Sequence, residues 1–321
     1  MQTDQPKKSD RKNPLRIGLV GCGRVAEFGY LPAFRQAMGV KLAGVVDINQ
    51  TRCKEVAPEV PAHESIHALI NAGGIDALII STPTRFHVAD ARCAAEAGLP
   101  ALVEKPPGLN VGEASAVHAL DPSPWIAFNR RFEPGIRKLK EKVPRDGDIH
   151  LRLELHYRKA AWKPFDMQDD ALLDLGPHLI DLARWLTGSE ILWARALSLQ
   201  ERRAEFEIGL ERGNATISCS NNTPYRERFE VKCACGRMTG FYKCGGLLPG
   251  IVARFQPNRE NPLVRPMVAQ LEAFGRAVRG RLDGSPLATT ADGLAVMSTI
   301  EAVRHSGAMG GVSRSVSSTE A

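Results

Sequence analysis

The stretch that decides the fold is Leu15-Arg-Ile-Gly-Leu-Val-Gly-Cys-Gly-Arg-Val-Ala26, a short apolar run that enters the pattern Gly21-x-Gly23-x-x-Ala26. Gly21 permits a tight turn, Gly23 has no side chain to block a pyrophosphate, and the small Ala26 lets the next helix pack close to the strand. The helix N-terminus offers unpaired N–H groups and a positive dipole end to phosphates. We therefore predict a strand–turn–helix unit that binds a dinucleotide.

A carboxylate follows the second predicted strand, residues 41–46, at Asp47. An acid at this place holds the ribose diol of a dinucleotide, although the interval from Gly23 is a little longer than usual. Because a carboxylate repels a 2′-phosphate, Asp47 favours NAD over NADP. Arg52 lies too far into the following predicted helix to reverse this preference. The alternative is a glycine-rich turn in another kind of α/β protein.

The composition predicts a globular protein of two domains. The chain has 321 residues, of which 43% are hydrophobic, and its net charge is +6. Residues 1–14 are basic and almost without apolar side chains, so we expect a disordered tail. No apolar segment follows these charges as in a signal peptide, and no stretch approaches the length of a membrane span. We expect a cytoplasmic protein with no membrane partner and no nucleic-acid partner, because basic residues elsewhere are interleaved with acids.

The seven cysteines are scattered, which is typical of cytosolic thiols. Cys233-x-Cys235 with Cys244 fits no standard zinc spacing. Phe229, Val231, Cys233 and Cys235 alternate as one face of a strand, where a free cysteine packs as a small hydrophobe. We therefore predict no metal site.

The first part of the chain, residues 15–128, alternates strands and helices. Mainly apolar runs at 75–80, 101–103 and 125–128 are predicted parallel strands. Helices are predicted from Asn49, over 88–97, and from Asn110, which forms a capping box with Glu113 and continues through His118. This alternation indicates a doubly wound parallel sheet of the Rossmann type, whose ligands lie beyond the carboxyl ends of its strands. The polar or turn residues at such ends are Asp47, Thr82, Pro83, Glu104, Lys105 and Asn129.

The second part, residues 129–306, changes to a period of two. Residues 150–157 and 203–211 alternate apolar and polar side chains, and Arg212-Gly213-Asn214 is a hairpin turn into a further strand. Apolar stripes at 267–278 and 296–303 predict two amphipathic helices. The pattern indicates an α+β domain with an open, mainly antiparallel sheet that helices cover on one face. The other face is expected to meet a symmetry mate, giving a homodimer or homotetramer. Residues 307–321 are expected to form a flexible tail.

Lys105 is the first candidate for chemistry. It lies between an acid and a proline just past a predicted parallel strand. A lysine at this ligand edge can hydrogen-bond a substrate hydroxyl and stabilise the alkoxide that forms as hydride leaves carbon. The alternative is an ordinary surface lysine.

The run 173–181 holds the second candidate cluster. Pro177 suits the first turn of a helix that continues to Gly188. Asp174 and His178 are four positions apart and could converge at that helix start. His178 is then a candidate general base, with Asp174 beside it or beside the substrate, and Asp181 could orient the imidazole instead. In the competing interpretation, His178 is a structural histidine satisfied by backbone groups.

Taken together, these motifs resemble the Gfo/Idh/MocA oxidoreductase family, which includes glucose–fructose oxidoreductase and inositol dehydrogenase. The resemblance extends from about Leu15 to Ser306. It rests on the segment Gly21–Ala26, Thr82-Pro83 with His87, Glu104-Lys105-Pro106, Asn129-Arg-Arg-Phe132 with Pro134, and Asp174-x-Gly176-x-His178-x-x-Asp181.

The resemblance implies a Rossmann domain followed by an α+β domain whose open sheet is commonly used for oligomerisation. It implies that Lys105, Asp174 and His178 are catalytic and, with Asn129, contact a carbohydrate or cyclitol substrate. Arg131 is expected to be structural. The predicted cofactor-binding residues are Gly21, Gly23, Arg24, Val25, Ala26, Asp47, Ile48, Ser81, Thr82, Pro83, His87, Glu104, Lys105 and Trp162.

The chain departs from the family pattern at two places. Asp169-Asp170-Ala171 stands where relatives often carry glycines, which would change the shape and charge of the pocket, and Pro106-Pro107-Gly108 is stiffer than the usual continuation. The leading hypothesis is an NAD-dependent oxidoreductase acting on a secondary alcohol or ketone of a sugar, sugar derivative or cyclitol. Imine or pyrroline reduction is an alternative within the enzyme class. A non-catalytic, dinucleotide-binding regulatory sensor is the alternative from another class.

Overall fold

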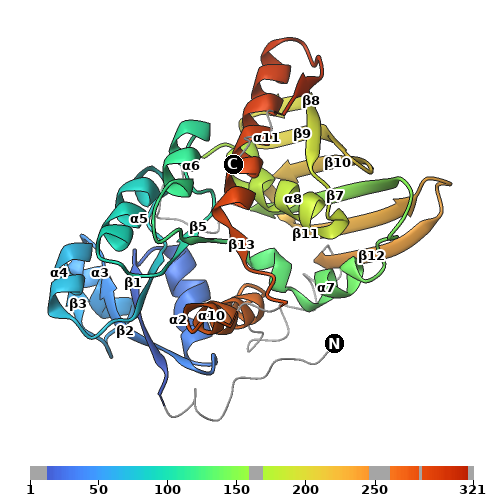
Figure 1. The fold of residues 1–321 in the computed structure, drawn as a ribbon. Helices are drawn as coiled ribbons and strands as arrows, with labels where there is room; N and C mark the ends of the chain where they lie inside the picture. Colours follow the sequence, from blue (N-terminus) through green and yellow to red (C-terminus); the bar gives the residue numbers. More distant parts are fainter. Residues whose placement is uncertain (1–12, 159–168, 246–260, 282–283, 317–321) are drawn as a thin grey trace. The chain divides into compact units, whose positions relative to one another are not determined.

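The computed structural model describes residues 13–158, 169–245, 261–281 and 284–316. The chain divides into two compact units, residues 1–132 with 260–291 and residues 133–259 with 292–321 (Figure 1). Within the described ranges, no helix has both the length and the apolar character needed to cross a membrane.

The first unit is built on a seven-stranded sheet of order β13-β6-β5-β4-β1-β2-β3, in which β13 alone runs antiparallel to its neighbour. The predicted doubly wound parallel sheet is therefore confirmed. All four residues of β4 are buried, which explains the continuous apolar run in the sequence. The strands are β1 (Leu15–Val20), β2 (Val40–Val46), β3 (Ala62–His63), β4 (Ala77–Ile80), β5 (Ala101–Glu104), β6 (Trp125–Ala127) and β13 (Ala288–Thr289).

Side-chain caps begin three helices of this unit. Asn49, Ser65 and Asn110 each accept a hydrogen bond from the backbone N–H three residues later. Asn49 and Asn110 are the predicted helix starts. The helical elements are η1 (Ala26–Tyr30), α2 (Leu31–Phe34), α3 (Gln50–Val56), α4 (Ile66–Ala72), η2 (Thr84–Phe86), α5 (His87–Glu96), α6 (Val111–His118), η3 (Asn129–Phe132) and α10 (Val264–Val278).

Helix α10 belongs to the first unit, although it comes more than 100 residues after β6. Its Met267, Leu271 and Phe274 share a buried core with Ile17 and Tyr30. The division predicted at residue 128 placed this helix in the second domain. The structure differs because the apolar stripe of α10 packs against η3, α2 and η1 and shares the core of the first unit, a long-range contact that sequence periodicity does not reveal.

The second unit contains another seven-stranded sheet, of order β12-β11-β7-β10-β9-β8-β14. Neighbouring strands are antiparallel except β7 and β10, so the predicted open, mainly antiparallel sheet is confirmed. The strands are β7 (Ile149–Arg158), β8 (Ile191–Gln200), β9 (Arg203–Leu210), β10 (Gly213–Ser220), β11 (Asn222–Cys233), β12 (Met238–Gly245) and β14 (Arg314–Ser315).

Two local predictions for this unit are wrong. Residues 307–316 are not a flexible tail, because α11 (Thr290–Ala308) continues into them and β14 pairs with β8, with the Val316 N–H donating to the Leu192 carbonyl at 3.0 Å. Cys235 does not continue the strand face, because β11 ends at Cys233. The chain turns there through Gly236, which has a φ of 79°.

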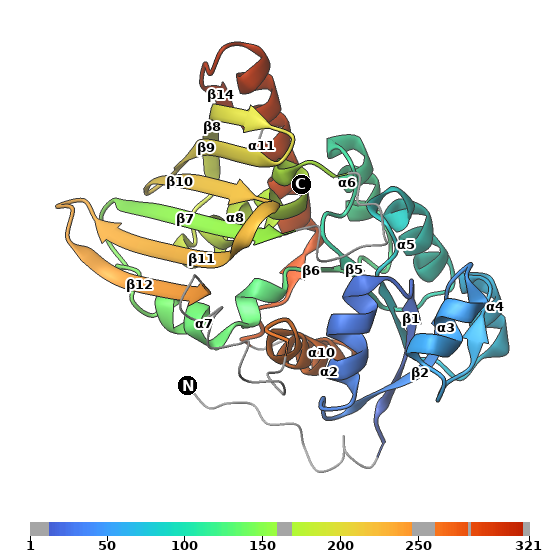
Figure 2. The same ribbon diagram turned by 180° about the vertical axis from the view of Figure 1, so that it is seen from behind.

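Helix α8 (Ala171–Thr187) contacts β7, β9 and β10 on one face of this sheet, where Leu153, Phe206 and Ile217 are fully buried (Figure 1). α7 (Pro134–Lys140) contacts β12 and α8. Figure 2 shows the sheet from the side opposite α8. Polar and charged side chains point to that open side, in register across β11, β7, β10 and β9, as the period of two predicts.

Gly213, in the predicted turn between β9 and β10, has a φ of 99°, and a β-carbon there would lie 2.7 Å from the backbone nitrogen of Ile149. We expect Gly213→Ala to lower the free energy of unfolding by more than about 2 kcal/mol, because backbone strain and a collision with main chain add together. Gly236→Ala is the matched control, since its φ is 79° but its β-carbon would meet nothing within 4 Å. It should lose only about 1 kcal/mol. Equal losses in urea unfolding would contradict this explanation.

Candidate functional site

The loop of residues 21–23, here called the glycine loop, packs against Ser81 at the end of β4 and leaves open space at Gly23. Gly21 has a φ of 94°, and a β-carbon on it would lie 2.7 Å from the Ser81 carbonyl oxygen. The Ser81 hydroxyl donates to the Gly21 carbonyl at 2.9 Å. A β-carbon on Gly23 would meet no atom within 4 Å. The loop therefore requires glycine at position 21 for its own packing, whereas Gly23 leaves room for a ligand.

Asp47 is fixed at the end of β2 by two backbone groups. One carboxylate oxygen accepts the Cys22 N–H and the other accepts the Asn49 N–H, both at 2.8 Å. The first bond joins Asp47 to the glycine loop itself. The next side chain, Ile48, is 95% exposed, so it offers an apolar surface beside the carboxylate.

Arg52 reaches the glycine loop, which its place in the sequence did not indicate. Its Nε donates to the Cys22 carbonyl at 3.1 Å. Its guanidinium also pairs with Glu27 at 2.5 Å, and Arg24 pairs with the same oxygen at 2.8 Å. Burial raises the pKa of Glu27, but the two guanidinium groups outweigh this and hold it below its usual range. The predicted cofactor residue Arg24 is thus part of a charged network around the loop.

His87 links the loops that follow β4 and β5. The ring is 1% exposed, with Nδ1 2.7 Å from the Pro106 carbonyl oxygen and Nε2 2.8 Å from that of Thr82. Burial is the largest influence and lowers the pKa of His87. The Thr82 hydroxyl donates to Asp90 at 2.6 Å. Both ring nitrogens of His87 thus lie against main chain, so the side chain holds Thr82 and Pro106 in place.

Glu104 and Lys105 lie at the end of β5. Glu104 is 7% exposed, and its carboxylate accepts the hydroxyl of the fully buried Tyr30 at 2.7 Å. The Lys105 N–H donates to the other carboxylate oxygen at 3.2 Å. Burial raises the pKa of Glu104 and that of Tyr30. Tyr30 is a site residue that sequence reasoning missed, because its partner is 74 positions away.

In the second unit, α8 carries Asp174 and His178, which are 6% and 8% exposed. The helix begins at Ala171, because the Asp170 carboxylate accepts the Leu173 N–H at 2.8 Å. Asp170 also pairs with Arg304 at 3.0 Å. The prediction that Pro177 opens the helix is wrong, since Pro177 lies in its interior.

The different helix start changes how the cluster is understood. Asp174 is in the first turn of α8, whereas His178 is one turn further along. Their spacing of four residues still places them on one helical face. The acid at position 170, which departs from the family pattern, acts as the helix cap and ion-pair partner just described.

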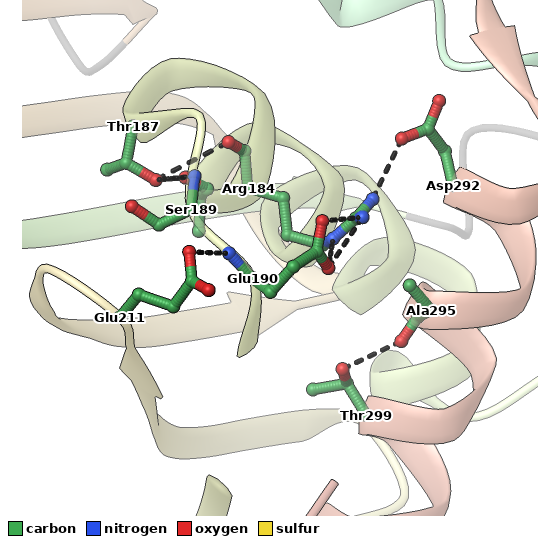
Figure 3. Close-up of polar contacts among 9 residues, drawn as sticks. Arg184, Thr187, Ser189, Glu190, Glu211, Asp292, Ala295 and Thr299 are labelled. Atoms are coloured by element: carbon green, nitrogen blue, oxygen red, sulfur yellow. Dashed lines mark hydrogen bonds and ion pairs between the residues drawn. The ribbon is translucent and has the colours of Figure 1, made fainter. Parts of the chain in front are cut away.

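Polar contacts anchor the last turn of α8 (Figure 3). Arg184 is held by Glu190, at 2.5 Å, and by Asp292 of α11, at 2.8 Å. Burial lowers the pKa of Arg184, but the two carboxylates outweigh this and raise it. The Thr187 hydroxyl donates to the Ala183 carbonyl at 2.7 Å. These contacts fix the helix that presents His178 and Asp174.

Three further predicted or neighbouring residues complete the description. Tyr157 on β7 is half-buried, and burial together with the nearby Asp174 carboxylate raises its pKa, although the sequence indicated only a strand position. Asn129 in η3 is 4% exposed, and its Oδ1 has no hydrogen-bond partner within the described part of the chain. Trp162, the predicted aromatic neighbour of the cofactor, lies outside the described residues. The described residues hold no group of three or more potential metal ligands.

Known proteins resemble the chain along most of its length. Rhizopine catabolism protein MocA from Rhizobium meliloti is 28% identical over 315 residues, covering 90% of this chain and 93% of the relative. Inositol 2-dehydrogenase 2 from Saccharopolyspora erythraea is 32% identical over 194 residues, covering 57% of this chain and 56% of the relative. The structure of scyllo-inositol dehydrogenase from Lactobacillus casei with bound NAD(H) and scyllo-inositol has a TM-score of 0.76 at 20% identity, covering 95% of this chain and all of that one.

Two family models match successive parts of the chain. Residues 15–122 match the oxidoreductase family with an NAD-binding Rossmann fold, and residues 148–239 match the GFO/IDH/MocA C-terminal domain. The two matches follow the order of the parallel and mainly antiparallel sheets seen in the structure. The chain therefore belongs to the Gfo/Idh/MocA family of NAD-binding oxidoreductases.

Proposed function

We propose that this protein is an NAD(H)-dependent oxidoreductase that acts on a secondary alcohol or ketone of a sugar, sugar derivative or cyclitol. The observation that carries the proposal is the edge of the parallel sheet, where Asp47 follows β2, the open space at Gly23 follows β1 and Lys105 follows β5. The relatives named inositol dehydrogenases support a polyhydroxylated substrate.

The residues at this edge fit a dinucleotide. The space at Gly23 admits a pyrophosphate beside the start of the first helix, and Asp47 presents a carboxylate for a ribose diol. We assign the whole predicted cofactor set of the first unit to this role, with His87 and Glu104 acting through the loops they hold. Bound NAD would supply a hydride acceptor for the substrate carbon.

The chain's own residues would manage the proton and the charge. The Lys105 ammonium would hydrogen-bond the reacting oxygen and stabilise its negative charge. His178 would take the hydroxyl proton as general base, and Asp174, on the same face of α8, would orient it or the substrate. Asn129, with a buried amide oxygen, would contact the substrate.

A screen of sugars, inositols and nucleotide sugars with NAD, followed by absorbance at 340 nm, tests this function. NADH formation with a polyol would support it. Imine or pyrroline reduction is the alternative within the enzyme class, and it would appear as NADH consumption with a cyclic imine alone. NAD binding without hydride transfer to any compound in the panel would favour the regulatory sensor.

The first prediction for this function concerns the cofactor. We expect the Kd of NADP to exceed that of NAD at least several-fold, because a 2′-phosphate would lie against the Asp47 carboxylate. Asp47→Asn should weaken NAD binding and bring the Kd of NADP closer to that of NAD. The change removes the negative charge but retains an oxygen that can accept a hydrogen bond. Asp76→Asn is the control, because Asp76 precedes β4 and pairs with Arg16 at the amino ends of the strands. Tighter binding of NADP by the wild type would refute the assignment.

The second prediction concerns the catalytic residues. Lys105→Ala and His178→Ala should each lower kcat by about 10²–10⁴-fold with little change in NAD binding, because both act mainly in the transition state. The double variant should be less than additive, since the two groups serve one proton transfer. The kcat of Asp174→Asn should lie between those of these variants and that of the wild type.

Matched controls distinguish these effects from general damage. Lys41→Ala and His305→Ala should leave kcat unchanged, because Lys41 is exposed at the amino end of β2 and His305 is exposed on α11. If His178→Ala lowers the Tm but leaves kcat within a few-fold of the wild type, His178 is structural and the sensor hypothesis regains weight.

The open face of the second sheet supports our further proposal that the protein is a homodimer or homotetramer. On this face Glu154 and Glu230 are only 4% and 5% exposed, and each carboxylate is ion-paired with an arginine. Phe241 lies beside Glu230 in register and is 51% exposed. An exposed aromatic ring among paired charges suits contact with the same face of a second copy.

We therefore expect light scattering to show an assembly larger than a monomer at micromolar concentration. Phe241→Asp should shift it toward the monomer, because the change places a carboxylate beside Glu230 at the contact. Met309→Asp is the control, since Met309 is 59% exposed but lies beyond the end of α11. A monomeric wild type would refute the proposed assembly.

A further inference from the structure

A single buried carboxylate connects the helix after the glycine loop to the main chain of Lys105. The Tyr30 hydroxyl donates to Glu104 Oε1 at 2.7 Å, and the Lys105 N–H donates to Oε2 at 3.2 Å. Tyr30 is fully buried and Glu104 is 7% exposed. One carboxylate oxygen of Glu104 thus bonds to η1, and the other bonds to the backbone N–H of the residue that directly follows it.

The Tyr30 hydrogen bond has a clear electrostatic role. Burial raises the pKa of Glu104, whereas the hydrogen bond from Tyr30 and the charge of Lys105 lower it. Hydrogen bonds to an ionised acceptor are stronger than those between neutral groups. Tyr30 therefore favours the charged form of Glu104, which is the form whose two oxygens both accept.

The element that carries Tyr30 is also unusual. Tyr30 is the last residue of η1, a π-helical turn that begins three residues after Gly23. Such turns are rare and are frequent at functional sites. On the other side of Lys105, the Pro106 carbonyl oxygen lies 2.7 Å from His87 Nδ1. Lys105 therefore has a buried anchor on each side along the chain.

We propose that Tyr30 is a positioning residue for Lys105, because its hydroxyl fixes the Glu104 carboxylate that holds the Lys105 main chain. The inference rests on the proposed role of Lys105 in the reaction. A displacement of about 1 Å in a catalytic group can lower a rate by about 10²-fold. Loss of one hydroxyl should therefore affect turnover although Tyr30 is not assigned any contact with the substrate.

Tyr30→Phe tests the proposal, since it removes the hydroxyl and keeps the buried ring. We expect kcat to fall about tenfold, with the Kd of NAD within about twofold of the wild type. Because the lost bond had lowered the pKa of Glu104, that pKa should rise. Protonation of Glu104 should then lower kcat at a higher pH than in the wild type, in addition to the acid limb that His178 contributes as general base. The groups acting on this carboxylate in the described residues are Tyr30 from η1 and Lys105 from the end of β5.

A second variant tests whether Tyr30 acts through Glu104. Glu104→Gln puts an amide in place of the carboxylate, so the two oxygens no longer accept equally. If Tyr30 acts through Glu104, the double variant should be no slower than Glu104→Gln alone. Additive losses in kcat would overturn the proposal.

Tyr242→Phe is the matched control. The Tyr242 hydroxyl also donates to a buried glutamate, Glu227, at 3.2 Å, but in the second unit. This variant loses the same kind of hydrogen bond, but Glu227 does not adjoin Lys105 in the chain. The variant should therefore leave kcat and its pH profile unchanged. Equal effects of Tyr242→Phe and Tyr30→Phe would show that the change is general and would overturn the proposal.

A measurement without turnover separates this proposal from the proposed function. Acetic anhydride labels lysines, and mass spectrometry then compares Lys105 with the exposed Lys41 as an internal reference. Tyr30→Phe should raise the relative labelling rate of Lys105 roughly threefold, because the residue is held less firmly. Tyr242→Phe should not. An unchanged rate in folded Tyr30→Phe protein overturns the positioning role, whereas a wild type that turns over no substrate overturns the proposed function alone.

Discussion

The first unit depends on the way its central parallel strands are tied together where they end. The Gly21 N–H donates to the Val46 carbonyl and the Ser81 N–H donates to the Val20 carbonyl, each at 2.7 Å. These bonds extend the pairing of β1 with both neighbours beyond the strands themselves. They hold three loop starts in register, so the polar residues that follow β1, β2 and β4 share one edge.

The side chains at this edge form hydrogen bonds with the protein backbone, in addition to the ligand contacts proposed for them. Asp47 accepts two N–H groups, His87 lies between two carbonyl oxygens, and Glu104 joins Tyr30 to Lys105. Residues selected from sequence as cofactor contacts are therefore also the contacts that shape the loops. This double role follows from burial, since polar groups removed from water must find partners within the protein.

In the second unit, a helix rather than a set of loops positions the candidate site residues. Its sheet has one face covered by α8 and one face of paired charges, and α8 is fixed at its start by Asp170 and at its end by Arg184. Because α8 is capped at both ends and buried along most of its length, it positions Asp174 and His178 without a loop to hold them. A site residue on a rigid helix keeps its direction better than one on a mobile loop.

The sequence by itself determined the parallel sheet, the glycine turn, the helix starts at Asn49 and Asn110 and the period-two strands, because each depends on local patterns of burial and capping. It also selected Asp47, Lys105, Asp174 and His178 as candidates. Only the tertiary structure decided that α10 joins the first unit, that β14 pairs with β8, that α8 begins at Ala171, and that Tyr30 meets Glu104. The packing and pairing contacts among these join residues far apart in the chain. The start of α8 depends on the Asp170 carboxylate, which accepts the Leu173 N–H, whereas Pro177 was the only helix start predicted from the sequence.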